Sequence, residues 1–277
     1  EVFSFPQWDF TFPGYIPILF VRKYRSSGAR RNCGLGFGWW HEYGWRATVS
    51  EQRIELVDGD GILWRYDGLA DGDSQLVGFG RRLTRRGDML AVTTPDGLRR
   101  TLLAHPCGFH LLVEIRDVLG NAVLCYPDEV GTIGRIVDSV GRRYERRVEG
   151  MTQTWEAIAT AADGTEQRRE LVTYVNDERG DLRRVIDANG HAWQFDYDDR
   201  HHLVREQRAD GLCFHFRYER LAKDGKRRCL ETWGDLAGRD ILAELGREAH
   251  AEVTPEGERP RGIYHLRFEY LPDDAGT

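Results

Sequence analysis

Acidic, imidazole and aromatic side chains gather in one short window, and these residue types bind metals or transfer protons. The window runs from Tyr174 to Leu203. Its candidate metal ligands are His191, His201, His202, Asp196, Asp198 and Asp199. Neighbouring side chains on a strand point to opposite faces, so His201 and His202 are not expected to join one site. We therefore expect these residues to serve turns and strand faces, and no metal ligand or cofactor is assigned.

A pair of carboxylates could instead cleave a glycosidic bond, which needs one acid with a raised pKa beside an ionised partner. Asp196 and Asp198 are expected on one face of a strand, where they could lie close together. Asp138 and Asp187 occupy equivalent turns, a placement that a repeat requires without any chemistry. A glycoside hydrolase is therefore the least favoured function, and no catalytic residue is assigned.

Two further motifs are incomplete as sites. The segment "GLGFG" at 34–38 lacks the Lys-Ser/Thr pair of a phosphate-binding loop, and two tryptophans follow it. Tight turn packing is the expected role of these glycines. Ser26 and Ser27 have no histidine in a recognisable arrangement, so neither is assigned as a nucleophile.

The cysteines indicate a reduced protein. They are five in number and contain no CxxC pair: Cys33, Cys107, Cys125, Cys213 and Cys229. Neither a disulfide framework nor a thiolate metal site is predicted from this pattern. Cys125 and Cys213 fall within alternating runs, where a small buried thiol is the expected role. Folding in a reducing cytoplasm follows.

The composition favours a thin, elongated core. Hydrophobic residues make up 40% of the 277 residues and charged residues 30%. The net charge of −6 comes from 45 acidic and 39 basic residues with both signs interspersed, which argues against a nucleic-acid surface. No apolar run reaches membrane-spanning length, and the first residues have no signal-peptide pattern. Because the chain lacks an initiator Met, we expect it to be a piece of a longer protein.

Short runs in which aromatic or aliphatic residues alternate with other residues form the elements that position these side chains. They are "GILWRY" (61–66), "HAWQFDY" (191–197), "CFHFRY" (213–218) and "IYHLRFEY" (263–270). Because successive side chains of a strand alternate between faces, each run predicts a strand with one buried aromatic face. In the full assembly, Trp193, Phe195, Phe214 and Phe216 are expected to be buried. Arg217 and Arg267 are expected to point outward, to solvent or to the lumen.

Asp-Gly turns separate the runs at a steady interval. The glycines Gly120, Gly141, Gly164, Gly190 and Gly211 follow one another by 21, 23, 26 and 21 residues. A strand, an Asp-Gly turn and a strand at this period predict a hairpin repeat, with each unit burying its apolar face against its neighbours. The exception is 235–253, where helical spacing with Asp240 as N-cap predicts one short helix or an irregular loop. The expected fold is all-β, with at most one or two short helices.

The windows between the turns share a consensus. Tyr174, Asp177, Gly180, Leu182, Val185, Asp187 and Gly190 read Y-x-x-D-x-x-G-x-L-x-x-V-x-D-x-x-G. This pattern resembles the YD repeat of the Rhs family, which insecticidal toxin-complex shells and teneurins share. Two departures are visible: Pro127 interrupts one Tyr-Asp pair, and Arg200 and His201 stand where a glycine is expected.

Two other segments resemble the same family. Residues 9–45 are similar to the segment that opens the Rhs core, through Arg22, Tyr24, Ser26 and the "GLGFGW" stretch. "RCLETWG" (228–234) is similar to a block of secretion-linked Rhs proteins. The resemblance implies antiparallel YD repeats that spiral into part of a hollow β-cage. It divides the chain into an opening β segment (1–115), a YD-repeat array (116–220), and a short insertion with a return strand (221–277).

Rhs proteins are polymorphic toxins, so the resemblance also implies a function. The chain is expected to be a structural, non-enzymatic shell segment of a type VI secretion or similar effector in bacterial competition. Its expected partners are the rest of the shell, an enclosed C-terminal toxin domain, and secretion-apparatus or chaperone proteins. It would reside in the bacterial cytoplasm before secretion or injection. The alternative is a carbohydrate-binding module that stacks sugars on exposed Trp64, Trp193 and Tyr197.

The repeat also predicts how the chain behaves alone. An isolated piece would expose apolar surface and an unpaired strand edge at its C-terminal end. We therefore expect residues 1–277 to be soluble and well ordered only within a longer β-cage, or with a partner that caps this edge.

Overall fold

The structure is a computed structural model, and it describes residues 1–219, 227–237, 239 and 262–270. Antiparallel strands dominate these residues, and their only helical segments are two short 3-10 turns, η1 (Ser26–Gly28) and η2 (Gly78–Gly80). The predicted all-β class is confirmed. Among the described residues, no helix is long and apolar enough to cross a membrane.

The first three strands form a small sheet of their own. They are β1 (Gln7–Phe12), β2 (Ile18–Tyr24) and β3 (Trp39–His41), and β2 pairs antiparallel with both neighbours. Alternating apolar residues in β2 place Ile18 and Phe20 on one face, where both are fully buried. This sheet therefore has a face that must be covered by another layer.

The other strands form one large antiparallel sheet. Its first hairpins are β4 (Arg46–Val49), β5 (Arg53–Val57) and β6 (Leu63–Asp67), and β4 also pairs with β11. A meander then begins with β7 (Ser74–Val77), β8 (Arg81–Arg86), β9 (Met89–Thr93), β10 (Arg99–Ala104) and β11 (His110–Arg116). The boundary predicted after residue 115 falls inside β11, and the division of the chain into segments stays a prediction.

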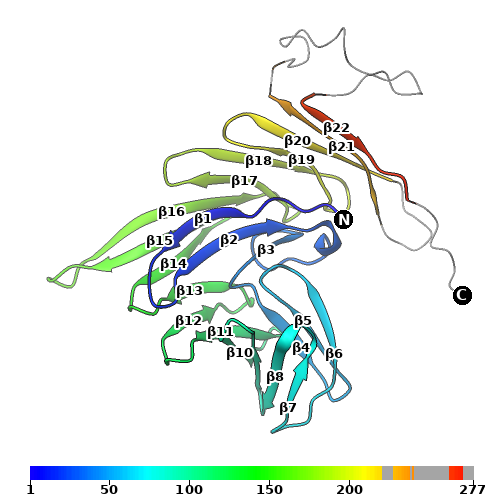
Figure 1. Ribbon diagram of the computed structural model, residues 1–277. Helices are drawn as coiled ribbons and strands as arrows, with labels where there is room; N and C mark the ends of the chain where they lie inside the picture. The colour runs from blue at the N-terminus through cyan, green and yellow to red at the C-terminus, as the bar shows by residue number, and fades with distance from the viewer. Residues whose placement is uncertain (220–226, 238, 240–261, 271–277) are drawn as a thin grey trace, which may run out of the picture.

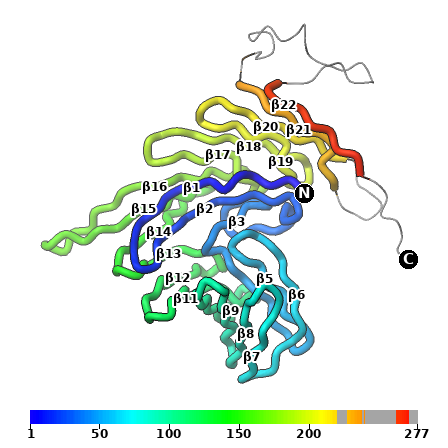
Figure 2. Tube along the Cα trace, in the orientation of Figure 1, coloured from blue at the N-terminus to red at the C-terminus, as the bar shows by residue number. Residues whose placement is uncertain are grey.

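The meander continues through the repeats, each strand pairing with the next. Its strands are β12 (Ala122–Pro127), β13 (Ile133–Val137), β14 (Arg143–Glu149), β15 (Thr152–Thr160), β16 (Glu166–Asn176), β17 (Leu182–Asp187), β18 (Ala192–Tyr197), β19 (Leu203–Gln207), β20 (Leu212–Tyr218), β21 (Cys229–Leu236) and β22 (Tyr264–Arg267). Figures 1 and 2 show these strands following one another along a curved wall. Asp235 and Leu236 end β21, and the short helix or irregular loop expected within 235–253, with Asp240 as its N-cap, lies mostly outside the described residues.

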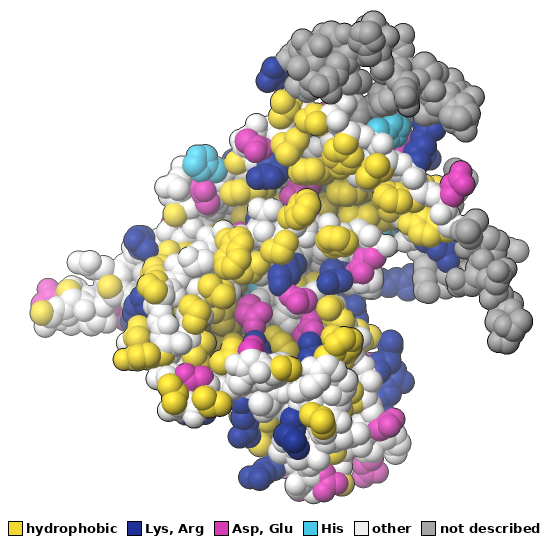
Figure 3. Space-filling view, viewed as in Figure 1, with side chains coloured by type: hydrophobic (Ala, Val, Ile, Leu, Met, Phe, Trp, Pro, Cys, Tyr) yellow, Lys and Arg dark blue, Asp and Glu magenta, His cyan; other side chains and the backbone are white. Residues whose placement is uncertain are grey.

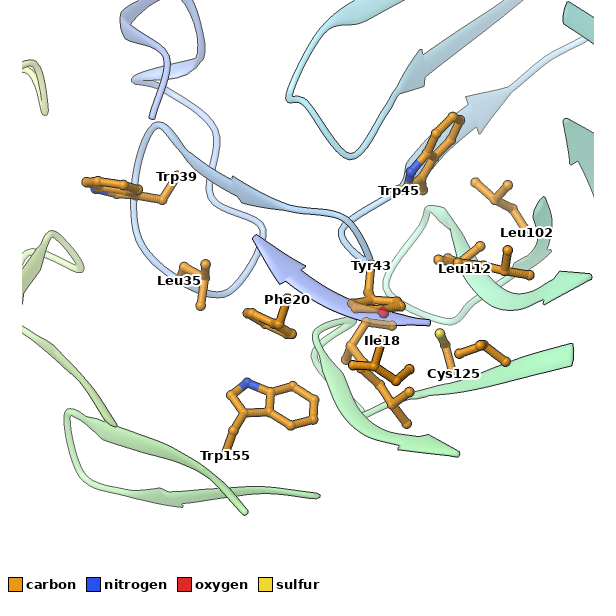
Figure 4. Packing of buried hydrophobic residues seen from close by; sticks show 14 of the residues in the cluster. Ile18, Phe20, Leu35, Trp39, Tyr43, Trp45, Leu102, Leu112, Cys125 and Trp155 are labelled. Atoms are coloured by element: carbon orange, nitrogen blue, oxygen red, sulfur yellow. The ribbon is translucent and has the colours of Figure 1, made fainter. Parts of the chain in front are cut away.

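The small sheet packs on the middle of this wall, where Figure 1 shows β1 and β2 lying across the repeat strands. The ring centres of Phe20 and Trp155 of β15 lie 5.2 Å apart, and those of Phe10 and Tyr144 of β14 lie 6.1 Å apart. Figure 4 shows Phe20 and Trp155 facing one another across this core. The repeats thus bury their aromatic face under the opening segment as well as against one another, which the repeat pattern did not predict.

This cover explains which predicted core residues are buried. Phe195 of β18 is fully buried, as expected. Trp193, Phe214 and Phe216, which are expected to be buried in the full assembly, are half-buried in this chain. Figure 1 shows β20, which carries both phenylalanines, lying beyond the small sheet, so one side of these rings lacks the second layer.

Most of the repeat turns share one backbone geometry. In five of them the first Asp accepts hydrogen bonds from the amides two and four residues on, and a glycine at the fourth position has a φ of 82° to 92°. These turns begin at Asp117, Asp128, Asp138, Asp177 and Asp187. Glycine adopts this left-handed conformation without a steric penalty, and the Asp side chain satisfies turn amides that no strand can reach. The Asp-Gly spacing in the sequence therefore follows from the geometry of these hairpin turns.

Candidate functional site

A buried ion pair joins the opening segment to the repeats. Arg22 of β2 has no exposed surface, and its Nε and Nη2 donate hydrogen bonds to Asp9 of β1 at 3.1 to 3.3 Å. Tyr174 of β16 donates its hydroxyl proton to the same carboxylate at 2.6 Å. Burial lowers the pKa of Arg22, but the charge and hydrogen bonds of Asp9 outweigh this and raise the pKa overall. Arg22 therefore stays charged inside the core.

Aromatic rings enclose the Arg22 guanidinium. Its carbon lies 5.1 Å from the ring centre of Trp39, 5.5 Å from Phe195 and 5.9 Å from Trp193. Such cation–π contacts strengthen when the cation is desolvated. Two of these rings come from β18, a repeat strand, so the Arg22 cation of the opening segment packs directly against the repeats.

The repeat tyrosines form further ties across layers. Tyr197 accepts a hydrogen bond from the Trp39 indole at 2.7 Å and donates to the carbonyl of Leu182 at 2.8 Å. Tyr24 of the small sheet accepts from the backbone amide of Leu203 at 2.9 Å. The hydroxyl groups of Tyr197 and Tyr24 thus have structural partners.

The turn after β18 departs from the shared pattern. His201 takes the place of the turn glycine with a φ of 67°, so it and His202 lie in a turn and not in a strand as expected. The His201 Nδ1 lies 2.7 Å from an oxygen of the buried Asp181, and its ring stacks on Phe37 at 4.0 Å. His202 instead lies beside Asp198. The two histidines therefore face different carboxylates and do not converge on one metal.

Replacing His201 tests how this turn is held. His201→Gly should change the free energy of unfolding by less than about 1 kcal/mol, because relief of backbone strain offsets the lost contacts. His201→Val should destabilise the protein by about 1–3 kcal/mol, because a β-branched residue tolerates positive φ poorly and cannot bond Asp181. Urea unfolding of the two variants measures the difference. Equal stability of the two variants would contradict this account.

The carboxylates considered for glycoside cleavage are each bound by other side chains or by turn amides. Asp196 accepts from Arg183 at 2.6 Å and from Arg205 at 3.3 Å. Burial raises the pKa of Asp198, but hydrogen bonds from His202 and from turn amides outweigh it and bring the pKa to about 2. A carboxylate with this pKa does not serve as a general acid near neutral pH. Asp199 lies exposed next to Arg227.

The other turn carboxylates are occupied as well. The buried Asp138 accepts from Arg142 and Tyr144, and these bonds with the turn amides lower its pKa despite burial. Asp187 lies 3.0 Å from the Nδ1 of His191, its neighbour in the same turn. Each acid thus stabilises its own hairpin.

The remaining motif residues are packed or capped. A Cβ atom on Gly36 would lie 2.8 Å from the Leu182 amide nitrogen, so this glycine allows close contact between the opening segment and the repeats. Ser26 accepts from the Val2 amide, and Ser27 donates to Glu1. Cys125 is buried, and burial raises its pKa.

The aromatic residues considered for sugar stacking belong to the core. Trp64, Trp193 and Tyr197 are half-buried and pack against the main cluster. The most exposed rings lie elsewhere, in the opening segment, where Phe3, Phe5 and Trp8 are each more than 60% exposed.

Sequence reasoning identified the turns but missed the ion pair. Asp9 and Arg22 each interrupt a largely apolar run, "FPQWDFTF" and "YIPILFVRKY". Two opposite charges within apolar strands are the signal that could have found this pair, because a charge is buried at low cost only with a partner.

Comparison with known proteins gives three similarities. Residues 2–66 match a family described as a domain of unknown function, DUF6531. Residues 177–212 match the RHS Repeat family. Double-stranded DNA deaminase toxin A of Burkholderia cenocepacia (strain H111) is 26% identical over 270 residues, which cover 87% of this chain. The matched region spans only 18% of that toxin's length.

Proposed function

The chain belongs to the Rhs family of YD-repeat proteins, and we propose that it is a structural segment of the shell of a secreted Rhs-type toxin. In this proposal the shell encloses a C-terminal toxin domain and carries it to a target cell. The observation that carries the proposal is the continuous antiparallel wall from β7 to β22, which is built largely from hairpins with one repeated turn. A wall of this kind can extend by adding hairpins, as an enclosing shell requires.

The junction around Arg22 supports a structural role for the opening segment. Its small sheet covers the middle of the aromatic face of the repeats, and this part of the face belongs to the core. The proposed partners are the rest of the shell, the enclosed toxin domain, and secretion-apparatus or chaperone proteins. The proposed location is the bacterial cytoplasm until delivery. No nucleic-acid contact is proposed for this segment.

We propose no enzymatic activity for the segment. Replacing Asp196 and Asp198 together with Asn should leave any hydrolytic activity of the chain unchanged, because both carboxylates bind arginines or turn amides. The substitution should affect only stability, by roughly 1–3 kcal/mol for lost charge-assisted hydrogen bonds. Assays on glycoside and ester substrates measure the activity, with circular dichroism as the control for folding. A hydrolytic activity lost in the folded variant would refute this assignment.

A second candidate function is carbohydrate binding, and one observation favours it. Trp8, which is 63% exposed, lines a cavity with Trp193 and with Asp187 and Asn189 of a repeat turn. An aromatic ring beside such polar groups suits a sugar. Under this alternative, Trp8→Ala should abolish oligosaccharide binding measured by calorimetry. An unmodified chain that binds no oligosaccharide removes the alternative.

The behaviour of the isolated chain separates the two candidates. Leu266, Phe268 and Tyr270 are each more than 40% exposed, and β22 pairs only with β21 among the described strands. Figure 3 shows hydrophobic side chains gathered over this end of the wall. A shell segment should therefore self-associate and bind an apolar dye, and Leu266→Asn with Phe268→Asn should reduce both effects. Sedimentation of the unmodified chain as a compact, dye-free monomer with cooperative unfolding would favour a self-contained binding module.

A further inference from the structure

Three side chains that carry metal-binding atoms meet on the face of the sheet opposite the core. Cys213 and His215 are two residues apart on β20, and Asp235 lies directly across from Cys213 on β21. One ligand atom from each lies within 4.8 Å of the other two. The register of the two strands, not the spacing in the sequence, creates this group.

The three groups are held toward one another. The His215 Nε2 lies 3.0 Å from an Asp235 oxygen. The imidazole stacks on Trp233 with ring centres 4.8 Å apart and planes 5° apart, which fixes the ring orientation. The Cys213 side chain is buried, whereas His215 and Asp235 remain partly open to solvent. A small ion can therefore enter from the solvent side and meet ligands already in place.

We propose that Cys213, His215 and Asp235 bind a divalent transition-metal ion of the zinc type, with the fourth position open to water. A thiolate, an imidazole and a carboxylate are the ligand types that zinc takes, and three protein ligands leave one position free. Tetrahedral bonds of 2.0 to 2.3 Å place ligand atoms about 3.3–3.8 Å apart. Ligand atoms that now lie up to 4.8 Å apart must therefore approach by at most about 1–1.5 Å. This inference does not depend on the shell function.

The neighbouring arginine does not prevent binding. The Arg205 Nη2 lies 3.6 Å from the Cys213 sulfur, and its guanidinium also bonds Asp196 and Gln207. Asp196, which Arg183 also contacts, offsets part of the charge of Arg205. A bound dication is balanced in turn by the Cys213 thiolate and the Asp235 carboxylate, so the assembled site is close to neutral.

Binding must release the thiol proton. Burial, together with the charge of Asp235, raises the pKa of the Cys213 thiol, while Arg205 acts in the opposite direction. Metal binding therefore displaces the thiol proton.

Cobalt(II) titration of the 277-residue chain under reducing, chelator-free conditions tests the proposal. The expected result is one equivalent bound, with a near-ultraviolet thiolate-to-cobalt band that zinc(II) removes. Cys213→Ser should abolish the band. Substitution of a residue that only supports a metal ligand weakens metal binding by roughly 10–100-fold. His215→Gln and Asp235→Asn each alter a ligand itself, so each should weaken metal binding by more than this. The matched control is Cys107→Ser, which alters a partly exposed thiol elsewhere and should leave the band unchanged.

Two outcomes would overturn the site. One is an unmodified chain that gives no thiolate band with one equivalent of cobalt. The other is a band that survives in Cys213→Ser or disappears in Cys107→Ser. Because a variant can lose binding by unfolding, circular dichroism of each must match the unmodified chain, and a zinc-dependent rise in Tm of the unmodified chain provides a second measurement.

Discussion

Replacing Arg22 with alanine should lower the free energy of unfolding by about 3–5 kcal/mol, the usual cost of breaking a buried ion pair. The variant leaves the Asp9 carboxylate buried with Tyr174 as its remaining side-chain donor. It also opens a space among the rings of Trp39 and Phe195, which now pack around the guanidinium. Urea unfolding followed by tryptophan fluorescence measures the change. All variants are compared at one low protein concentration, because association through β22 would add to apparent stability.

An exposed ion pair supplies the matched control for Arg22. Arg53 pairs with Glu55 on the surface of β5, so Arg53→Ala should cost no more than about 1 kcal/mol. Replacing Arg22 with Met and Asp9 with Leu together should cost less than Arg22→Ala alone, because no charge is then left buried without its partner. An Arg22→Ala variant as stable as Arg53→Ala would mean that the junction does not hold the two sheets together.

The strands and turns of this fold follow from local sequence. Alternation in "HAWQFDY" predicts β18, because the side-chain period of a strand is two residues. The Asp-Gly spacing predicts the hairpins, because the Asp side chain and the glycine conformation both act within five residues. Features whose cause lies this close in the chain can be predicted without knowing the tertiary structure.

The pairing of the two layers could not be predicted in this way. Tyr174 and Asp9 are 165 residues apart, and no local pattern indicates which repeat strand the opening segment covers. His201 illustrates the same limit. Its place in the repeat indicates a turn, but the sequence does not indicate that Asp181 and Phe37 hold it there in a left-handed conformation.

The group of Cys213, His215 and Asp235 depends on strand register. Asp235 lies 22 residues after Cys213, and the length of chain between them does not fix the pairing of the two strands. A register shifted by one residue would move Asp235 to the other face of the sheet. Sequence reasoning therefore expected an ordinary buried thiol at Cys213, and only the paired strands reveal its neighbours.

Phe195→Ala should destabilise the protein by about 3–5 kcal/mol, and Phe216→Ala by clearly less. Both rings are aromatic positions of repeat strands, and the sequence predicted burial for both. Phe195 is 1% exposed and packs edge-on against Trp39 at 4.8 Å beneath the small sheet. Phe216 lies on β20 beyond that cover and is half-buried, so its removal leaves a smaller cavity that solvent can reach. The two variants thus compare the same substitution with and without the second layer, measured by urea unfolding at one protein concentration. Equal losses for both would mean that contacts between neighbouring repeats, not the opening segment, provide most of the stability of the wall.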